Sequence, residues 1–199
     1  MRDHSQPKVW TTRTYNRLAK YYDLFMKIFY PIGEKGREKI VERLNSGSVL
    51  DIACGTGTLL TMAFKKGLEC YGIDNSQGML NKARVKVPGA ELKNASYYDI
   101  PYQDGLFDYV VASNALSGTY IDAERVLTEM TRVCKSGGKI YIAEWPKAES
   151  ITLTERLTVW FASLFEDAPK DYQAIFTRIG YEPEVEILSK RYHIFGIEK

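Results

Sequence analysis

The 199-residue sequence predicts an α/β fold, a single domain spanning 1–199 with a mostly parallel seven-stranded sheet. Three observations predict it. Short apolar runs alternate with segments of helical periodicity, a glycine-rich turn follows the first run, and the last two runs alternate apolar and polar residues. A chain of this length is expected to bury one hydrophobic core.

The first half of the alternation reads as strand, turn, helix, strand and helix. A strand is expected over Ser48–Ala53, and the turn Cys54–Gly57 leads from it into a helix. A second strand, 69–73, stops at Asp74, and Ser76 is a suitable N-cap for the helix that follows. Strands separated by helices in this way lie parallel to one another.

The middle of the chain continues the same pattern. We expect a buried strand over 106–113 and an amphipathic helix over 122–134. The glycine pair 137–138 then introduces another strand, 139–145.

The C-terminal part of the chain departs from this alternation of strands and helices. A helix over 171–179 precedes two alternating strands, 185–188 and 192–197, which predict an antiparallel hairpin at the sheet edge. Together the elements predict a doubly wound, Rossmann-like arrangement with an antiparallel C-terminal edge hairpin.

Two regions flank the alternating core, and both carry many apolar side chains. The first, 14–44, is expected to form an N-terminal helical cap. The second, 146–199, begins with an expected lid helix and ends in the hairpin. The apolar positions of the two segments are Tyr15, Tyr21, Tyr22, Phe25, Phe29 and Tyr30, and Leu153, Leu157, Trp160, Phe161 and Leu164. Either they cover the mouth of a site or they pack onto the sheet as core.

Composition narrows the choice of partners and surroundings. The 27 basic and 25 acidic residues leave a net charge of +2, so no nucleic-acid partner is expected. Three cysteines, Cys54, Cys70 and Cys134, fit neither a disulfide framework nor a metal site, which favours the cytoplasm. No apolar run approaches the roughly 20 residues of a membrane span, so any membrane contact is expected to be peripheral. The sequence leaves the oligomeric state open.

The glycine-rich turn predicts a ligand site. In open α/β sheets, ligands bind beyond the carboxyl ends of the strands where the strand order reverses. Gly55 and Gly57 allow close approach of a ligand to the backbone, and Asp74 can accept hydrogen bonds from two ribose hydroxyls. Leu60 stands where a dinucleotide motif has its third glycine, which disfavours a dehydrogenase.

Four segments in order resemble the class I S-adenosylmethionine-dependent methyltransferases, over roughly half the chain. They are VLDIACGTGTLL (49–60), YGIDNSQGMLNKAR (71–84), YYDIPYQDGLFDYVVASNAL (97–116) and LTEMTRVCKSGGKIYIAEW (127–145). The resemblance implies that 48–145 is a cofactor-binding core and that the cofactor is S-adenosyl-L-methionine, with S-adenosyl-L-homocysteine as product.

Carried over position by position, the resemblance assigns a role to each matched residue. Asp51, with the glycines, would hold the methionine part, Asp74 the ribose, and Asp99 the adenine amino group. Asp99 could instead serve only as a turn former. Ser113 and Asn114 would lie beneath the sulfonium. The expected cofactor-binding residues are Tyr22, Asp51, Ala53, Gly55, Gly57, Asp74, Asn75, Met79, Asp99, Ile100, Ser113 and Asn114.

The acceptor is less defined by the sequence. The segment 15–39 resembles the opening of ubiquinone and menaquinone C-methyltransferases and of phospholipid N-methyltransferases, where the pair matched by Tyr22-Asp23 helps to close the site. After Ala148 the quinone-enzyme pattern is absent. We expect a small-molecule or lipid-like acceptor, with a quinone precursor as one candidate. The alternatives are a small polar amine or hydroxyl, or a non-catalytic cofactor-binding partner subunit.

Two other features bear on the chemistry. The segment 113–116 reads Ser-Asn-Ala-Leu and lacks the Pro-Pro-aromatic sequence of nucleic-acid amino-methyltransferases, which disfavours exocyclic base methylation. The catalytic base is left unassigned. His193 is expected to have a structural or surface role, and Glu144 could be a base or a hydrogen-bond acceptor.

Overall fold

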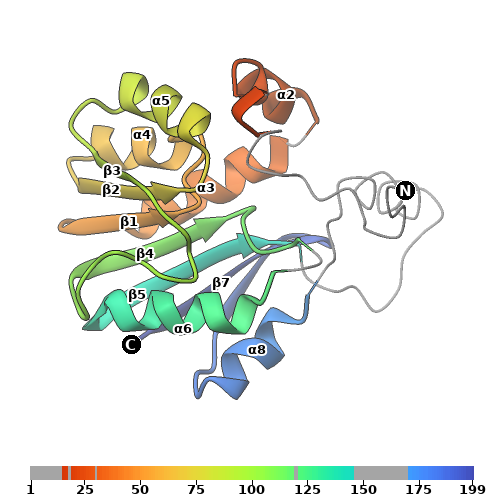
Figure 1. The fold of residues 1–199 in the computed structure, drawn as a ribbon. Coiled ribbons are helices and arrows are strands. Elements are labelled where there is room, and N and C mark those ends of the chain that lie inside the picture. The colour runs from red at the N-terminus through yellow and green to blue at the C-terminus, as the bar shows by residue number, and fades with distance from the viewer. Residues whose placement is uncertain (1–14, 18, 30, 119–120, 146–169) are drawn as a thin grey trace, which may run out of the picture.

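The computed structural model describes residues 15–17, 19–29, 31–118, 121–145 and 170–199. Seven strands form one sheet in the order β3-β2-β1-β4-β5-β7-β6 (Figure 1). The strands are β1 (Ser48–Ile52), β2 (Glu69–Asp74), β3 (Glu91–Asn94), β4 (Phe107–Ser113), β5 (Cys134–Glu144), β6 (Glu184–Ser189) and β7 (Tyr192–Glu198).

Strand directions confirm the mostly parallel sheet. The first five strands pair in parallel, from β3 at one edge to β5. The C-terminal strands form the expected hairpin, in which β7 runs antiparallel to both β5 and β6. The hairpin therefore extends the sheet through β7, and β6 is the outer edge.

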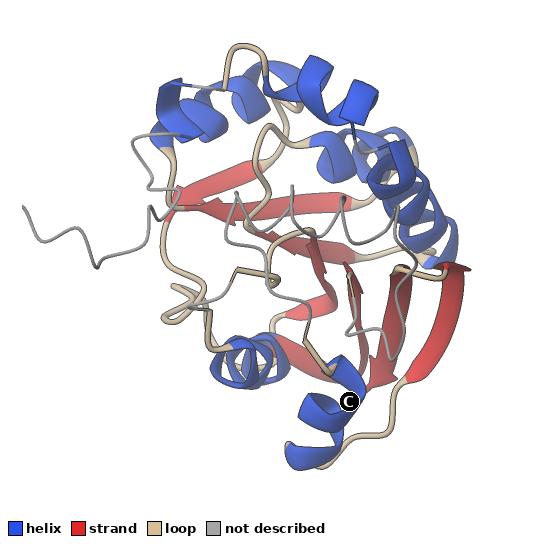
Figure 2. Cartoon of the chain, turned by 90° about the vertical axis from the view of Figure 1, so that its right-hand side faces the viewer, coloured by secondary structure: helices blue, strands red, loops and turns tan. Residues whose placement is uncertain are grey.

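Helices cover both faces of the sheet (Figure 2). They are α2 (Tyr22–Phe29), α3 (Pro31–Arg43), α4 (Thr58–Lys65), α5 (Gln77–Lys86), α6 (Ala123–Val133) and α8 (Tyr172–Arg178). One buried cluster joins α3, α4 and α5 to the sheet through Ile40, Leu60 and Leu80. The other joins α6 and α8 to the opposite face, so the chain is wound on both sides as expected.

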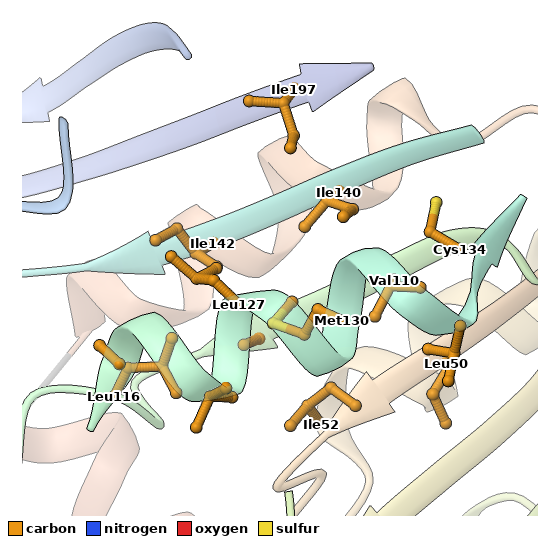
Figure 3. Packing of buried hydrophobic residues seen from close by; sticks show 14 of the residues in the cluster. Leu50, Ile52, Val110, Leu116, Leu127, Met130, Cys134, Ile140, Ile142 and Ile197 are labelled. Carbon is orange, nitrogen blue, oxygen red and sulfur yellow. The ribbon is translucent and has the colours of Figure 1, made fainter. Parts of the chain in front are cut away.

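The packing of α6 shows why its sequence forms an amphipathic helix. Its Leu127 and Met130 are fully buried and lie over Val110 of β4 and Ile140 of β5 (Figure 3). Asp122 caps the first turn by accepting a hydrogen bond from a backbone N–H three residues later. Burying a leucine side chain is worth about 1.5–3 kcal/mol, so this apolar face fixes the helix on the sheet.

Two elements differ from the sequence expectation. The strand β3 was not located from the sequence, because it is a short edge strand whose residues are polar or half-exposed and give no apolar run. The glycine pair 137–138 does not precede the strand, as the sequence predicts, but lies within β5. There Gly137 has a φ of 74°, and the pairing with β4 jumps from Cys134 to Lys139, so the glycines form an irregularity in the strand.

The described part of the N-terminal cap includes the helices α2 and α3. Helix α3 lies against β5 and β7, where a Cβ on Gly36 would overlap the ring of Tyr192. The side chains of Phe25, Phe29 and Tyr30 and the whole segment 146–169, with its expected apolar stripe, lie outside the described residues. Within the described part of the chain, no helix is long and apolar enough to span a membrane.

Candidate functional site

The carboxyl ends of β1 and β4 meet at the point where the strand order reverses. From β1 the chain turns outward through residues 53–57 into α4, and the arrowheads of β4 and β5 point to the side on which α2 lies (Figure 1). In this turn Gly55 and Gly57 have φ values of 54° and 77°, which favour glycine. A Cβ on Gly57 would come within 3.0 Å of Ala83, so this glycine also lets α5 approach.

Asp74 at the end of β2 is tied to the glycine turn. Its carboxylate accepts one hydrogen bond from the backbone N–H of Gly55 and one from that of Ser76, both 2.8 Å long. The side chain is buried, which raises the pKa of Asp74, while the two N–H donors oppose that rise. The loops after β1 and β2 are thus joined through one carboxylate.

A cavity of about 230 Å³ opens beside the turn. Its wall combines the ends of β1 and β4 with the two N-terminal helices and the last residue of α5. The lining residues are Tyr22, Asp23, Met26, Lys27, Glu34, Arg37, Asp51, Ala53, Cys54, Gly55, Thr56, Thr58, Leu59, Lys86, Ser113 and Asn114.

Helix α2 is held over this cavity by polar contacts. Asp23 accepts a hydrogen bond from the Thr56 hydroxyl and forms an ion pair with Lys86, whose Nζ lies 2.6 Å from the carboxylate. Lys86 also donates to the Thr56 hydroxyl, at 3.0 Å. The three side chains link α2, the glycine turn and α5. Further along, the Asn16 side chain accepts hydrogen bonds from the Ser76 hydroxyl and the Gly78 N–H.

Asp51 forms part of the cavity floor. It is 3% exposed, and burial raises its pKa to about 8, opposed by the nearby Arg37 and reinforced by the charge of Asp74. Burying an ionised carboxylate at the end of a central strand costs free energy unless a cation or a hydrogen-bond donor lies beside it. Asp51 is therefore suited to a positively charged ligand group.

The loop after β4 is fixed from beneath by Glu144. This residue is fully buried at the end of β5, and its Oε1 accepts hydrogen bonds from the backbone N–H groups of Ala115 and Leu116. Asn114 has a φ of 52° and packs against Gly33 of α3, where a Cβ would approach its Nδ2 to 2.8 Å. Of the two roles considered for Glu144, the contacts agree with the hydrogen-bond acceptor.

Sequence comparison links the chain to methyltransferases. Residues 50–142 match the family model of a methyltransferase domain. A demethylmenaquinone methyltransferase of Thermotoga maritima is 32% identical over 138 residues, covering 66% of this chain and 60% of that protein. A phosphatidylethanolamine N-methyltransferase of Cereibacter sphaeroides is 34% identical over 139 residues, 66% of each chain. The chain therefore spans less than two thirds of either protein's length.

Broader coverage comes at lower identity. A demethylmenaquinone methyltransferase of Bacillus mycoides is 28% identical over 203 residues, covering 92% of this chain and 85% of that protein. Among solved structures, a SAM-dependent methyltransferase from Thermotoga maritima has a TM-score of 0.69 at 17% identity, covering 94% of this chain and 98% of its own. The DhpI–SAH complex has a TM-score of 0.72 at 16% identity, covering 93% of each chain.

The chain belongs to the class I S-adenosylmethionine-dependent methyltransferases. S-adenosylmethionine is the cofactor of this family, and the residues of the cavity suit it. The backbone at Gly55 is open, because an added Cβ would meet no atom within 4 Å. Asp51 offers a carboxylate, and Ser113 and Asn114 offer polar groups at the adjacent strand end. These residues could hold the methionine end of the cofactor.

The cavity of this methyltransferase includes half of the residues that the sequence assigned to the cofactor. Tyr22, Asp51, Ala53, Gly55, Ser113 and Asn114 line it. Gly57 and Asp74 lie behind the turn, where they shape it. Asn75 is exposed and Met79 is buried at the start of α5, where its N–H donates to the capping hydroxyl of Ser76.

Asp99 and Ile100 are not brought to the cavity. They line a separate open groove together with Tyr71, Tyr102 and Arg132. The backbone of Ile100 is anchored to α6, since its N–H donates to Glu129 and its carbonyl accepts from Arg132. These two hydrogen bonds fix the backbone of the segment to α6. The adenine role of Asp99 stays a prediction.

Tyr97 packs against one of the two buried clusters. It is half-buried in the loop after β3, and burial raises its pKa to about 12, with a contribution from the charge of Asp74. Thr56, Lys86 and Arg37 line the cavity but were not identified from the sequence. Thr56 was within the recognised turn, whereas the positions of Lys86 and Arg37 depend on how α5 and α3 pack.

Proposed function

We propose that this protein transfers the methyl group of S-adenosylmethionine to a lipid-like small molecule, with a quinone precursor as the first candidate. The observation that carries the proposal is the cavity at the switch point of the sheet, which α2 covers with Tyr22 and Met26. Most of the cavity wall is polar, but Tyr22 and Met26 give it one apolar side, which suits a flat or lipid-bearing acceptor. The demethylmenaquinone and phosphatidylethanolamine methyltransferases among the relatives support the same class.

The chemistry asks little of the protein beyond alignment. S-adenosylmethionine, when bound, supplies a methyl group already activated on a sulfonium. A lone pair of the acceptor forms the new bond to the methyl carbon as the carbon–sulfur bond breaks and its electron pair stays on sulfur. Holding the reacting groups in line can contribute up to about 7–11 kcal/mol.

Specific contacts support that alignment. Glu144 fixes the loop that follows Ser113 and Asn114, so it is a positioning residue. The link from Asp23 to Thr56 and Lys86 keeps α2 over the cavity and limits the entry of water. His193 is not among the residues that line the cavity and packs beside Phe195, in agreement with a structural role.

The surface of α2 and the residue before it supports a peripheral contact with lipid. Tyr21 and Leu24 are 61% and 62% exposed, and Lys20 and Lys27 are close by in the sequence. Aromatic and apolar side chains flanked by lysines are typical of segments that lie in a membrane interface. A lipid-bearing acceptor would then reach the cavity without leaving the bilayer completely.

The test begins with calorimetric titration of S-adenosylhomocysteine, followed by transfer of a labelled methyl group. The acceptor panel contains a demethylmenaquinone, phosphatidylethanolamine vesicles, and small polar amines and hydroxyls. We expect binding, and turnover of a lipid-bearing acceptor. Binding without methylation of any acceptor would favour a non-catalytic partner subunit, and turnover confined to small charged acceptors would exclude the lipid-like class.

A further inference from the structure

Arg37 is a cation of the cavity wall that forms no ion pair with the described residues. It projects from α3 into the cavity, and its Nε is buried with no hydrogen-bond acceptor among the described residues. No carboxylate of the described residues comes within salt-bridge distance of its guanidinium. A buried donor without an acceptor is destabilising, and a ligand that accepts a hydrogen bond from it would recover that loss.

The neighbouring charges make Arg37 distinct. Lys86, another cation of the cavity wall, is already paired with Asp23 at 2.6 Å. Asp51 is close enough to Arg37 for their charges to interact, and Glu34, one turn earlier on α3, also lines the cavity. The wall near Arg37 therefore presents one guanidinium that is in no ion pair of the described residues, together with two carboxyl groups.

This pattern complements an amino-acid zwitterion. A guanidinium offers five donors in a planar fork that matches both oxygens of a carboxylate. Carboxyl groups nearby attract an ammonium group. The methionine end of S-adenosylmethionine carries an α-carboxylate and an α-ammonium on the same carbon. Its binding site therefore needs a positive and a negative group side by side.

We propose that Arg37 binds the α-carboxylate of the cofactor by a bidentate hydrogen bond, with Asp51 and Glu34 facing its α-ammonium. The inference rests on the proposed function, since it requires S-adenosylmethionine as the bound molecule. The cofactor site would then include a residue of the N-terminal cap, besides the glycine turn and the end of β4. Helix α3 would bind the cofactor as well as cover it.

The experiment separates the amino-acid end of the ligand from its nucleoside. Dissociation constants are measured by calorimetry for S-adenosylhomocysteine and for 5′-methylthioadenosine, which lacks the amino-acid carbons beyond the sulfur-bound methyl. Arg37→Met should weaken S-adenosylhomocysteine binding 10- to 100-fold and leave methylthioadenosine binding within twofold. Arg37→Lys keeps the positive charge but not the planar fork. Its dissociation constant for S-adenosylhomocysteine should lie between those of the unaltered protein and of Arg37→Met.

A matched control comes from the same helix. Arg43 is also on α3, pairs with Glu186 and is not among the cavity residues, so Arg43→Met should leave both constants unchanged. Equal weakening of the two ligands by Arg37→Met, or no weakening of either, would overturn the proposal. Should Arg37→Met not fold, the unaltered protein still provides a test. It should bind decarboxylated S-adenosylhomocysteine at least tenfold more weakly than the parent compound, and equal binding would overturn the proposal.

The outcomes distinguish this inference from the proposed function. An unaltered protein that binds neither ligand would contradict the proposed function itself. Tight binding of S-adenosylhomocysteine that is indifferent to Arg37 and to the ligand carboxylate would contradict only the role of Arg37. Failure to methylate any acceptor leaves the two binding measurements intact.

Discussion

At the scale of single residues, the glycine turn contains one position that is strained. Ala53 has a φ of 54°, in the left-handed region, although it has a Cβ. This conformation costs a non-glycine residue roughly 1–2 kcal/mol, and the greater freedom of glycine in the unfolded chain costs about 0.5–1 kcal/mol. We predict that Ala53→Gly raises the free energy of unfolding by about 0.5–1 kcal/mol.

Urea denaturation measures this change. Ala63→Gly, in the buried interior of α4, is the matched control and should lower stability by about 1 kcal/mol. A loss of stability in Ala53→Gly similar to that of the control would show that the turn does not strain Ala53.

The buried carboxyl of Asp51 gives stability a dependence on pH. Its pKa is raised from 3.8 to about 8 on folding, so between these values the folded state holds one proton more than the unfolded state. The contribution of this proton to the free energy of unfolding is therefore fully present below about pH 4 and is lost as the pH rises to about 8. Each pH unit within this window is worth at most about 1.4 kcal/mol.

Asp51→Asn removes the titration with little change in shape. Without cofactor, the variant should gain stability relative to the unaltered protein between pH 5 and pH 8, by up to about 4 kcal/mol. Urea unfolding of both proteins at pH 5, 6.5 and 8 measures the difference. A difference that stays constant with pH would show that Asp51 is ionised in the folded protein throughout this range.

The positions of Tyr97 and Asp99 predict opposite results for two alanine variants. Tyr97 is half-buried near Asp74, whereas Asp99 is exposed and lines the separate groove. Tyr97→Ala should weaken S-adenosylhomocysteine binding about five- to tenfold, because a ring contact is worth about 0.5–1.5 kcal/mol. Asp99→Ala should change the constant less than twofold. The reverse pattern would support the adenine role that the sequence motif suggests for Asp99.

At the scale of the elements, the sequence predicted what local pattern determines. The turn after β1, the Ser76 cap and the C-terminal hairpin each follow from residues adjacent in the chain, and all three are present. What could not be predicted depends on distant partners. Edge strand β3 needs β2 to define it, and the cavity face of α3, with Arg37, is set by packing against β5 and β7.

The junction of two loops at Asp74 changes what its removal should do. The sequence suggests that Asp74 only binds ribose, but its carboxylate also accepts the N–H groups of Gly55 and Ser76. Asp74→Ala leaves two buried donors unpaired, at about 1–3 kcal/mol each. We predict a loss of about 2–4 kcal/mol in stability, together with at least a tenfold loss of cofactor affinity.

Asp74→Asn separates the two roles. Its amide oxygen can keep one N–H bond, so its loss of stability should be smaller than that of Asp74→Ala. Chemical denaturation and calorimetric titration of both variants measure the two effects. Unchanged affinity in both variants would refute the ribose assignment, and unchanged stability would show that the two loops hold without this carboxylate.

At the scale of the whole molecule, the cavity is lined by residues from Tyr22 to Asn114. Its cover comes from α2, and its floor comes from the ends of β1 and β4. Both buried clusters pack on the same sheet, with adjacent residues of β1 pointing to opposite faces. Core and cap should then unfold together, as expected for a single domain.

Differential scanning calorimetry tests this expectation. We predict one transition whose calorimetric and van't Hoff enthalpies agree, at roughly 140 kcal/mol near 60 °C for a chain of this length. S-adenosylhomocysteine at 100 times its dissociation constant should stabilise the folded state by about 2.7 kcal/mol and raise the whole transition by roughly 5–10 °C. Two transitions, of which the ligand moves only one, would instead show that the N-terminal cap folds separately from the cofactor-binding core.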